Sequence, residues 1–368
     1  MFIRCSQEEL SYALSVVARA LPIRGEDAGN IPDGVLLTAD SRGLTLTVIN
    51  ERMGITTRID AQVKEEGVVL IGRIFNEVVR HLPKGEVTLE RKDTRMYISA
   101  PGSRIMLSCR EEDTYPLLPS ERAQSPVILK QQVFRDMVRQ TAFAASMDLS
   151  RPILTGVYLH VKDQKLTMVS LDGFRLALRE TELGDAYKEL SAVVPASAMT
   201  ELSRIAGSDE ENIDLTFTPQ HLIADMGETR FSTRLLKGEY INYAQLLTTE
   251  SQTNVVISRM DLVEAVERAS AIAQEARNNL VKLTIRNDGG VRLHAESEMG
   301  SVDEDLDGHV TGRELEIAFN SRYIGDVIKN LSEDSIKMCF NTSISPCVIR
   351  PVTGTEFLYL VLPVRVSI

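Results

Sequence analysis

The chain of 368 residues contains no tryptophan, only four cysteines and no long uninterrupted run of apolar residues. A helix that crosses a bilayer needs about 18 or more consecutive apolar residues, so we expect no membrane segment. The first residues, Met1 to Ser6, also lack the basic start and apolar core of a secretory signal. These absences predict a cytoplasmic protein.

The few cysteines and histidines form none of the spacings that hold a metal ion. The cysteines include no Cys-x-x-Cys pair, which argues against a zinc site and a disulfide framework; they are Cys5, Cys109, Cys339 and Cys347. The histidines are scattered along the chain, at His81, His160, His221, His294 and His309. We therefore expect buried thiols, no metal and no cofactor.

Motifs of the common enzyme classes are missing as well. The sequence has no glycine-rich phosphate loop ending in Lys-Ser or Lys-Thr, no H-E-x-x-H and no G-x-S-x-G. The dipeptide Asp172-Gly173 is more simply interpreted as a β-turn than as a catalytic loop. The sequence thus predicts a protein that is not an enzyme.

One complete motif is present, and its context argues against it. Asp303 to Glu314 fits the calcium-loop pattern D-x-D-x-D-G-x₅-E. A calcium loop of this type requires a helix on each side. Here Val291 to Ala295 and Leu315 to Phe319 have the composition of strands, so we expect no calcium site and no calcium-dependent hydrolase.

Basic residues are also in short supply. Lys and Arg number 41 against 52 Asp and Glu, which gives a formal net charge of −11. A protein held on nucleic acid by many phosphate contacts usually has an excess of positive charge. Any binding to DNA must therefore depend on something other than a large basic surface.

An internal repeat is the strongest positive signal, and repeats should be sought before single motifs are trusted. An amphipathic helix is predicted three times, at 6–20, 130–146 and 260–274, and Ser6 with Glu9 predicts a capping box on the first. A β-hairpin follows each helix. Gly34 and Gly156 open the first two hairpins, 122 residues apart. A second helix is predicted in register at 74–82, 196–205 and 321–331, before further strands.

These patterns divide the chain into three tandem α+β domains, at 1–122, 126–249 and 254–368. A chain of this length exceeds what one hydrophobic core usually supports, and about 120 residues is a common domain size. Polar segments near 120–125 and 248–253 mark the joins. A triplication alone is also compatible with similar domains stacked without a shared function.

Specific residues favour one family. Arg151-Pro152-Ile153-Leu154-Thr155-Gly156, continuing to Leu171-Asp172-Gly173-Phe174-Arg175-Leu176, resembles the middle domain of the bacterial DNA sliding clamp, the beta subunit of DNA polymerase III. Phe319 to Tyr323 and the ending Tyr359 to Arg365 resemble the last domain of that family. The resemblance covers the whole chain. The first domain departs most, at Ile49-Asn50-Glu51 and Pro32-Asp33-Gly34, which leaves a specialised paralogue open.

The resemblance implies a head-to-tail homodimer whose six processivity-fold domains form a ring, with helices inside and sheets outside. Such a ring encircles duplex DNA without sequence specificity, because base contacts would hold it at preferred sites. Its partners would be DNA polymerase subunits, the clamp loader and repair proteins, which bind through short peptide motifs. The alternative is a protein-interaction scaffold that never encloses DNA.

For DNA contact, the resemblance points to Arg24 and Arg73, and the predicted helices add Arg19, Arg135 and Arg139. The last three are also compatible with ordinary solvated helix charges. Six helix windows together hold eleven Lys or Arg against nine Asp or Glu, so the acidic charge lies mostly outside the helices. Other DNA-contacting positions of the family fall on Asp148, Pro152 and Ile153 here, which do not suit that role.

The resemblance also implies a partner-peptide pocket and a dimer interface. The pocket would consist of Leu154, Leu171, Gly173, Phe174, Arg175, Leu176, Ile241, Leu246, Asn320, Tyr323, Ile344, Pro346, Val361, Leu362, Pro363 and Val364. Ile241 and Gln245 depart from the proline and arginine that the family usually has. The interface would consist of Ile105, Met106, Leu107 and Ile272. Taken without the resemblance, each pocket residue is more simply interpreted as a core position, and Ile272 is equally compatible with one.

Overall fold

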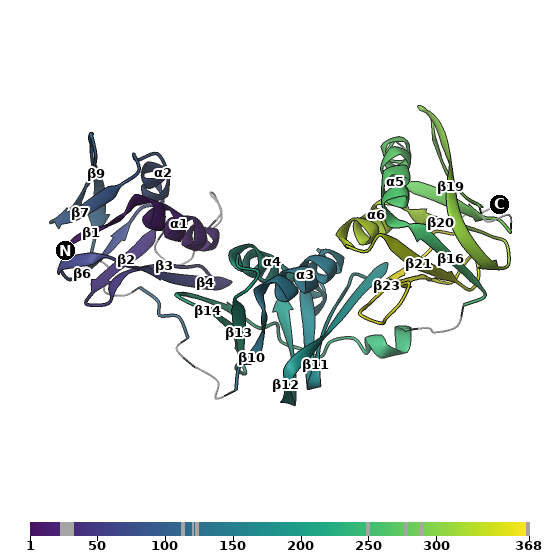
Figure 1. Cartoon of the computed structure of the whole chain (residues 1–368), viewed down its shortest axis with the longest axis horizontal. Coiled ribbons are helices and arrows are strands. Elements are labelled where there is room, and N and C mark those ends of the chain that lie inside the picture. The colour runs from purple at the N-terminus through teal and green to yellow at the C-terminus, as the bar shows by residue number, and fades with distance from the viewer. Residues whose placement is uncertain are drawn as a thin grey trace. The chain divides into compact units, whose positions relative to one another are not determined.

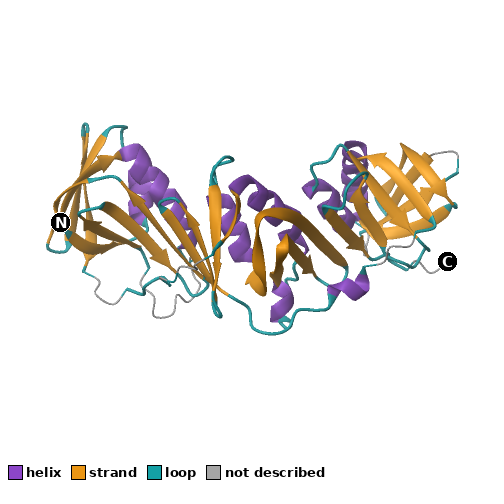
Figure 2. Cartoon of the chain, turned by 60° about the horizontal axis from the view of Figure 1, so that its bottom comes forward, coloured by secondary structure: helices purple, strands orange, loops and turns teal. Residues whose placement is uncertain are grey.

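A computed structural model describes residues 1–22, 33–111, 115–119, 121, 125–247, 251–275, 279–287 and 290–365. The chain divides into two compact units, Met1–Gln132 with Glu201–Leu235, and Val133–Thr200 with Leu236–Ile368. No helix among the described residues is long and apolar enough to cross a membrane. The helices and strands are labelled in Figure 1 and coloured by type in Figure 2.

The first unit contains one continuous sheet in the order β10-β13-β14-β15-β4-β3-β2-β6-β9-β8-β7-β1-β5. Its elements are β1 (Phe2–Ser6), α1 (Gln7–Val17), η1 (Ala18–Ala20), β2 (Val35–Asp40), β3 (Gly43–Ile49), β4 (Met53–Ile59), β5 (Gln62–Glu65), β6 (Gly67–Ile71), α2 (Ile74–Arg80), β7 (Glu86–Lys92), β8 (Arg95–Ala100), β9 (Ser103–Arg110), β10 (Val127–Lys130), β13 (Asn212–Phe217), β14 (His221–Met226) and β15 (Thr229–Arg234).

The second unit contains a sheet in the order β11-β12-β23-β22-β21-β16-β19-β18-β17-β20. Its elements are η2 (Ala142–Ala144), η3 (Pro152–Thr155), β11 (Gly156–Leu171), β12 (Arg175–Pro195), η4 (Tyr243–Leu246), β16 (Thr253–Ser258), α5 (Arg259–Ala273), β17 (Leu280–Ile285), β18 (Gly290–Ser297), β19 (Gly300–Gly312), β20 (Leu315–Asn320), α6 (Ser321–Asn330), β21 (Ser335–Phe340), β22 (Cys347–Pro351) and β23 (Phe357–Val361). Helices α3 (Gln131–Thr141) and α4 (Ala196–Ile205) have residues in both units.

Strand pairing confirms the threefold repeat. In each repeat the strand before the first helix begins a ladder of four strands, and equivalent residues face one another across it. The ladders are Ile3–Leu89–Ile98–Ile105, Val127–Leu215–Ala224–Phe231 and Val255–Met338–Ile349–Tyr359. Ile3, Val127 and Val255 each lie four residues before the start of their helix. Alternate apolar residues on most of these strands are buried, as period-two strands with one core face require, but Ile105 and Leu107 of β9 are only partly buried.

The repeats meet by strand pairing. We call β9, β15 and β23 the last strands, and β4, the start of β12 and the start of β19 the fourth strands. Within the first unit, last strand β15 pairs with fourth strand β4, with Phe231 opposite Ile55. Within the second unit, last strand β23 pairs with the start of β12, with Tyr359 opposite Ala177. Each sheet is therefore continuous across a boundary between repeats.

The helices lie close to their predicted ranges, because an amphipathic period fixes which residues can face a core. Leu10, Leu14 and Val17 of α1 are buried as expected. The predicted capping box was wrong, because the Ser6 side chain makes no cap hydrogen bond. The amide of Gln7, the first helical residue, donates to the Gly85 carbonyl at 2.9 Å and so gains a partner outside the helix. Ser6 is the last residue of β1, so the adjacent strand connection supplies the acceptor.

The aspartate-rich segment is flanked by strands β18 and β20 and not by helices, as expected. Its residues up to Gly312 lie in a third strand, β19. Asp305 receives hydrogen bonds from the Arg292 guanidinium at 3.1 Å, and Glu304 pairs with Arg268. The Arg292 hydrogen bond lowers the pKa of Asp305 from its ordinary value. An extended strand places Asp303, Asp305 and Asp307 in a row along one face and Glu304 on the other, so they do not surround one point as the ligands of a calcium loop do.

Candidate functional site

The Arg175 side chain is fixed at the junction between the central and third repeats of the second unit. Its guanidinium donates to the carboxylates of Asp172 at 3.1 Å and Asp326 at 2.5 Å, and to the Phe143 carbonyl at 3.0 Å. It also lies over the Tyr323 ring, 5.0 Å from the centroid. Only 10% of this side chain is exposed. Because one guanidinium binds the carboxylates of Asp172 and Asp326 together, Arg175 holds α6 against the start of β12.

Five side chains of the expected pocket are apolar and exposed. We call them the Phe174 patch: Phe174, Ile241, Leu246, Ile344 and Leu362. The Phe174 ring stacks on the Tyr323 ring of α6, with centroids 5.4 Å apart and an interplanar angle of 15°. Phe174 is nevertheless 55% exposed. The Leu362 amide donates to the Phe174 carbonyl at 2.8 Å, which brings the C-terminal segment to the same turn.

A buried cluster supports this patch from below. It contains Leu154, Leu171, Leu176 and Leu360, and the segment 240–247 packs on it through Tyr240, Tyr243 and Leu247. The Tyr240 ring stacks on Tyr158 at 5.1 Å, and burial raises the pKa of Tyr240. Aromatic stacking and burial give the segment a fixed position although it contains only one short 3₁₀ turn. Ile241 and Leu246 are thus held in the exposed layer.

The structure brings together the segments of the pocket expected from sequence, all within one unit. Of those residues, Leu154, Leu171 and Leu176 are buried in this cluster and Val361 is buried in the neighbouring core, whereas the Phe174 patch is exposed. Val361 of β23 lies between two partners, with Arg175 of β12 on one side and Cys347 of β22 on the other. This also brings the turn that carries Ile344 and Pro346 towards the same end of the sheet. Peptide binding at this site stays a prediction.

Sequence reasoning missed two residues that fix this site. Asp172 lies three residues before Arg175, and its carboxylate also accepts the Phe174 and Arg175 amides, at 2.9 and 3.0 Å. The Asp-Gly turn signal could have identified it. Asp326 is 151 residues from Arg175, and no local pattern predicts such a partner.

The arginines expected to contact DNA are mostly paired within the fold. Arg73 donates to the Asp33 carboxylate at 3.0 and 2.8 Å, and Arg19 donates to Glu201 at 3.1 Å. Arg139 bonds to Asp136, the Asn330 carbonyl and the Ser332 hydroxyl. Arg135 is partly buried on α3, and Arg24 lies outside the described residues. Their contact with DNA stays a prediction.

Two strands keep one edge that no described strand occupies. In β9, residues 103–108 pair with β8 only, and β6 reaches only Cys109 and Arg110. In β19, residues 300–307 pair with β18 only, and β16 begins at Gly308. An open edge presents unpaired backbone groups and favours pairing with another chain. β9 is a last strand and β19 begins as a fourth strand, so one edge of each kind is open.

Ile272, near the end of α5, differs from its equivalents in the other two repeats. The first helices begin at Gln7, Gln131 and Arg259, so Ala20, Ala144 and Ile272 occupy the same position in the three repeats. Ala20 and Ala144 are fully buried at 0% exposure. Ile272 is only partly buried. It is therefore not an ordinary core residue in the isolated chain.

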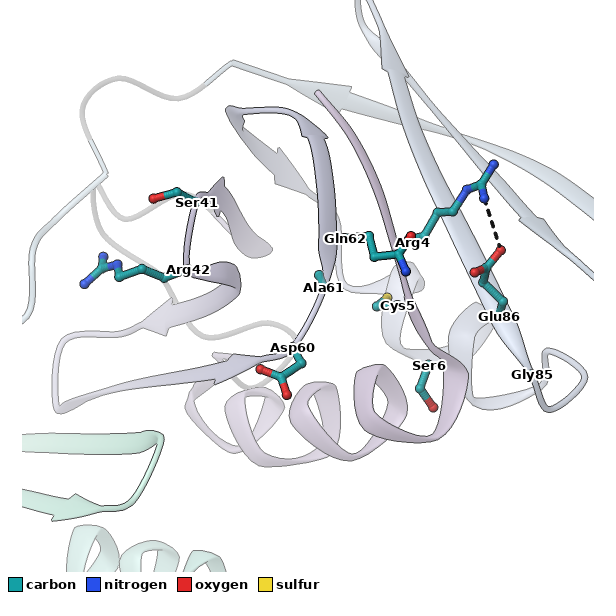
Figure 3. A pocket seen from close by; sticks show the side chains of 10 residues that line it. All are labelled: Arg4, Cys5, Ser6, Ser41, Arg42, Asp60, Ala61, Gln62, Gly85 and Glu86. Atoms are coloured by element: carbon teal, nitrogen blue, oxygen red, sulfur yellow. Dashed lines mark ion pairs between the residues drawn. The ribbon is translucent and has the colours of Figure 1, made fainter.

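A separate cavity in the first repeat does not look like a site. It has a volume of about 560 Å³ and is bordered by Arg4, Cys5, Arg42 and Asp60, among others. Figure 3 shows the Arg42 and Asp60 side chains both pointing away from Cys5. Burial raises the pKa of Cys5 to about 12, so this thiol stays protonated and is a poor nucleophile. All four cysteines are buried and free, as expected.

Comparison with known proteins gives one consistent result. Residues 1–119, 128–242 and 244–365 match the N-terminal, central and C-terminal domains of the DNA polymerase III beta subunit. The beta sliding clamp of Synechococcus elongatus is 33% identical over 99% of both chains, and that of Staphylococcus epidermidis is 30% identical over 90% of this chain and 91% of its own. The crystal structure of the DNA polymerase sliding clamp from Bacillus subtilis is 28% identical, covers 100% of both chains and gives a TM-score of 0.94.

Proposed function

The chain belongs to the family of bacterial DNA polymerase III beta subunits, and from this premise we propose how its own residues close a ring and bind partners. It is a DNA sliding clamp, which tethers a polymerase to DNA and confers processivity. The observation that carries the proposal is the repeated junction. Each internal junction pairs a last strand with a fourth strand, and one open edge of each kind remains.

The two internal junctions also share one register. Phe231 and Tyr359 end equivalent ladders, and so does Ile105. Ile55 and Ala177 are 122 residues apart, the same as the two glycines. The third repeat is aligned through the first strands. Gln62 pairs with Arg4 of β1, and His309 pairs with Val256, the equivalent residue of β16, so Gln62 and His309 are equivalent. Ile55 lies seven residues before Gln62 and Val302 lies seven residues before His309, which makes Val302 the equivalent of Ile55.

Ring closure in the same register places Ile105 of one chain opposite Val302 of the next. Arg104 then faces Asp303, and both side chains are exposed in the isolated chain. Opposite charges directly across a ladder are favourable. Because the contact joins different surfaces of two chains, it is head-to-tail, and two chains close it as a ring. We infer that these pairs hold the homodimer together.

The packing at the open edges complements this register. In the second unit, the large Tyr359 packs with Ala144 and Ala177 in one buried cluster. At the open edges the equivalent of Tyr359 is the smaller Ile105, and the equivalents of the alanines are the larger Ile272 and Val302. A smaller residue on one side therefore meets larger residues on the other, which is the direction of change that a close-packed interior favours.

The test of the clamp function compares circular DNA with the same DNA after linearisation. A closed ring is linked to a circle and leaves a linear molecule by its ends, so retention is expected on circles alone. The measurement is the fraction of chain that co-elutes with DNA on gel filtration after loading. Equal retention on both forms would instead indicate a scaffold that binds DNA, if at all, without enclosing it.

We further propose that the Phe174 patch binds the partner peptides, with a glutamine and bulky apolar residues of the Gln-Leu-x-Leu-Phe type. The proposal is supported by exposed apolar side chains over a fixed buried cluster, with Arg175 fixed next to Phe174. Exposed apolar clusters of this kind often mark interaction sites. Polymerase subunits, the clamp loader and repair proteins would share it.

Tethering a polymerase to DNA needs no bond to be made or broken, so we propose that the chain is not an enzyme. We also propose that it acts in the cytoplasm, and that its three domains are 1–122, 126–249 and 254–368.

Deleting Pro363 to Ile368 is expected to abolish peptide binding while the ring survives. The deletion removes Val364, whose amide donates to the Ala318 carbonyl at 2.8 Å, and frees the end of the chain next to Leu362. Fluorescence anisotropy of a labelled peptide measures the loss, and light scattering checks the dimer. Val352→Ala is a suitable control, because Val352 is 46% exposed and is not among the patch residues. Unchanged affinity in the truncated chain would contradict the assignment.

A further inference from the structure

Glu201 on α4 is shared by two arginines of the first unit. Its carboxylate accepts a hydrogen bond from Arg19, in η1, at 3.1 Å and another from Arg204, one turn further along α4, at 2.5 Å. Arg19 belongs to the first repeat, and Glu201 and Arg204 belong to the central repeat. One carboxylate therefore neutralises two helix-surface cations from different repeats.

This carboxylate is more sheltered than its counterparts on the other helices. Glu201 is 22% exposed, whereas Asp136, which pairs with Arg139 on α3, is 44% exposed, and Glu77, which pairs with Arg80 on α2, is 54% exposed. A sheltered ion pair is screened less by salt than an exposed one. The Glu201 pairs thus persist at salt concentrations at which open surface pairs contribute little.

We propose that Glu201 is a positioning residue that limits how strongly the clamp contacts DNA, because it holds Arg19 and Arg204 away from phosphates. This rests on the proposed function, in which the helices line the hole. The three side chains together carry one net positive charge where the two arginines alone would carry two. A carboxylate next to a guanidinium also repels a phosphate that approaches the same group.

A limit on contact strength suits a ring that must move. Each phosphate contact releases counterions and adds affinity, and every contact has to be broken at each step along the duplex. A clamp retained by linkage gains nothing from tight contact and slides more slowly with it. Weak, partly neutralised arginines therefore keep the ring centred without holding it in place.

Glu201→Gln tests the proposal, since it keeps the shape of the side chain and removes its charge. We expect binding to a short linear duplex, which cannot retain a ring by linkage, to become about tenfold tighter at about 50 mM salt, and the slope of log K against log salt to steepen by about one to two. Glu90→Gln is the matched control. It makes the same charge change in β7, where Glu90 pairs with Lys92, and should leave both quantities unchanged.

Adding Arg19→Gln or Arg204→Gln to Glu201→Gln should remove part of the gain, because each takes away one freed cation. An unchanged salt slope in Glu201→Gln, with the wild-type chain still retained on circular DNA, overturns this proposal and leaves the clamp function intact. Loss of wild-type retention on circles contradicts the clamp function itself. If Glu201→Gln does not fold, Arg204→Gln alone decides: little change supports the proposal, and a loss of a whole unit of slope overturns it.

Discussion

Ile272→Asp is expected to give a folded monomer that still binds the partner peptide but no longer stays on circular DNA. In the proposed closure Ile272 takes the place that Ala20 and Ala144 occupy at the internal junctions, where both are fully buried. Burying an unpaired carboxylate in a small apolar contact costs several kcal/mol, and about 1.4 kcal/mol is tenfold in affinity. A head-to-tail ring of two chains contains this contact twice, so the dimer should weaken by orders of magnitude.

Light scattering tests whether the Ile272→Asp chain is a monomer, and thermal unfolding tests whether it is folded. The isolated chain leaves Ile272 only partly buried, so the monomer should unfold at nearly the wild-type temperature. Met260→Asp is the matched control: it places the same charge on the same helix, at a residue that is 47% exposed, and should stay dimeric. A variant at Ile272 that remains a dimer, or one that does not fold, would show that this residue lies elsewhere than in the interface.

The fold could be predicted from sequence as far as local pattern reaches. The amphipathic period places α5 at Arg259–Ala273 against an expected 260–274, because buried positions on a helix recur with a fixed spacing. The expected capping box at Ser6 does not form, and the start of the helix depends on a contact that is not local. Pairing of β1 with β7 brings the Gly85 carbonyl there, where it accepts a hydrogen bond from the Gln7 amide.

The candidate site could be predicted only in part. The resemblance named Phe174 and Leu176 together, yet one is 55% exposed and the other 2%. Alternation along a strand would place residues 174 and 176 on the same face, but Phe174 lies in the turn before β12, so its exposure depends on what packs around that turn. The partner Asp326 and the shared register of the junctions depend on contacts between repeats. Those contacts follow from tertiary pairing, and no window of sequence contains them.

The register itself makes the sharpest prediction, because it names the residue pair that must be matched across the ring contact. Arg104→Asp and Asp303→Arg are each expected to weaken the dimer, since each places like charges opposite one another, and like-charge juxtaposition can cost several kcal/mol. Arg110→Asp is the control. It makes the same charge change on β9, where β6 already pairs with the strand, and should leave the dimer intact.

Mixing the two weakened chains should restore the ring. In a mixed dimer one junction joins the two substituted residues and the other joins the two native ones, so both junctions carry opposite charges. Neither chain alone can achieve this, because its own copies repeat the mismatch twice. Analytical ultracentrifugation of each chain and of their equimolar mixture measures the effect, with a return to the wild-type dimer expected only in the mixture. A mixture as monomeric as its components would show that Arg104 and Asp303 do not face each other and that the closing junction uses a different register from the two within the chain.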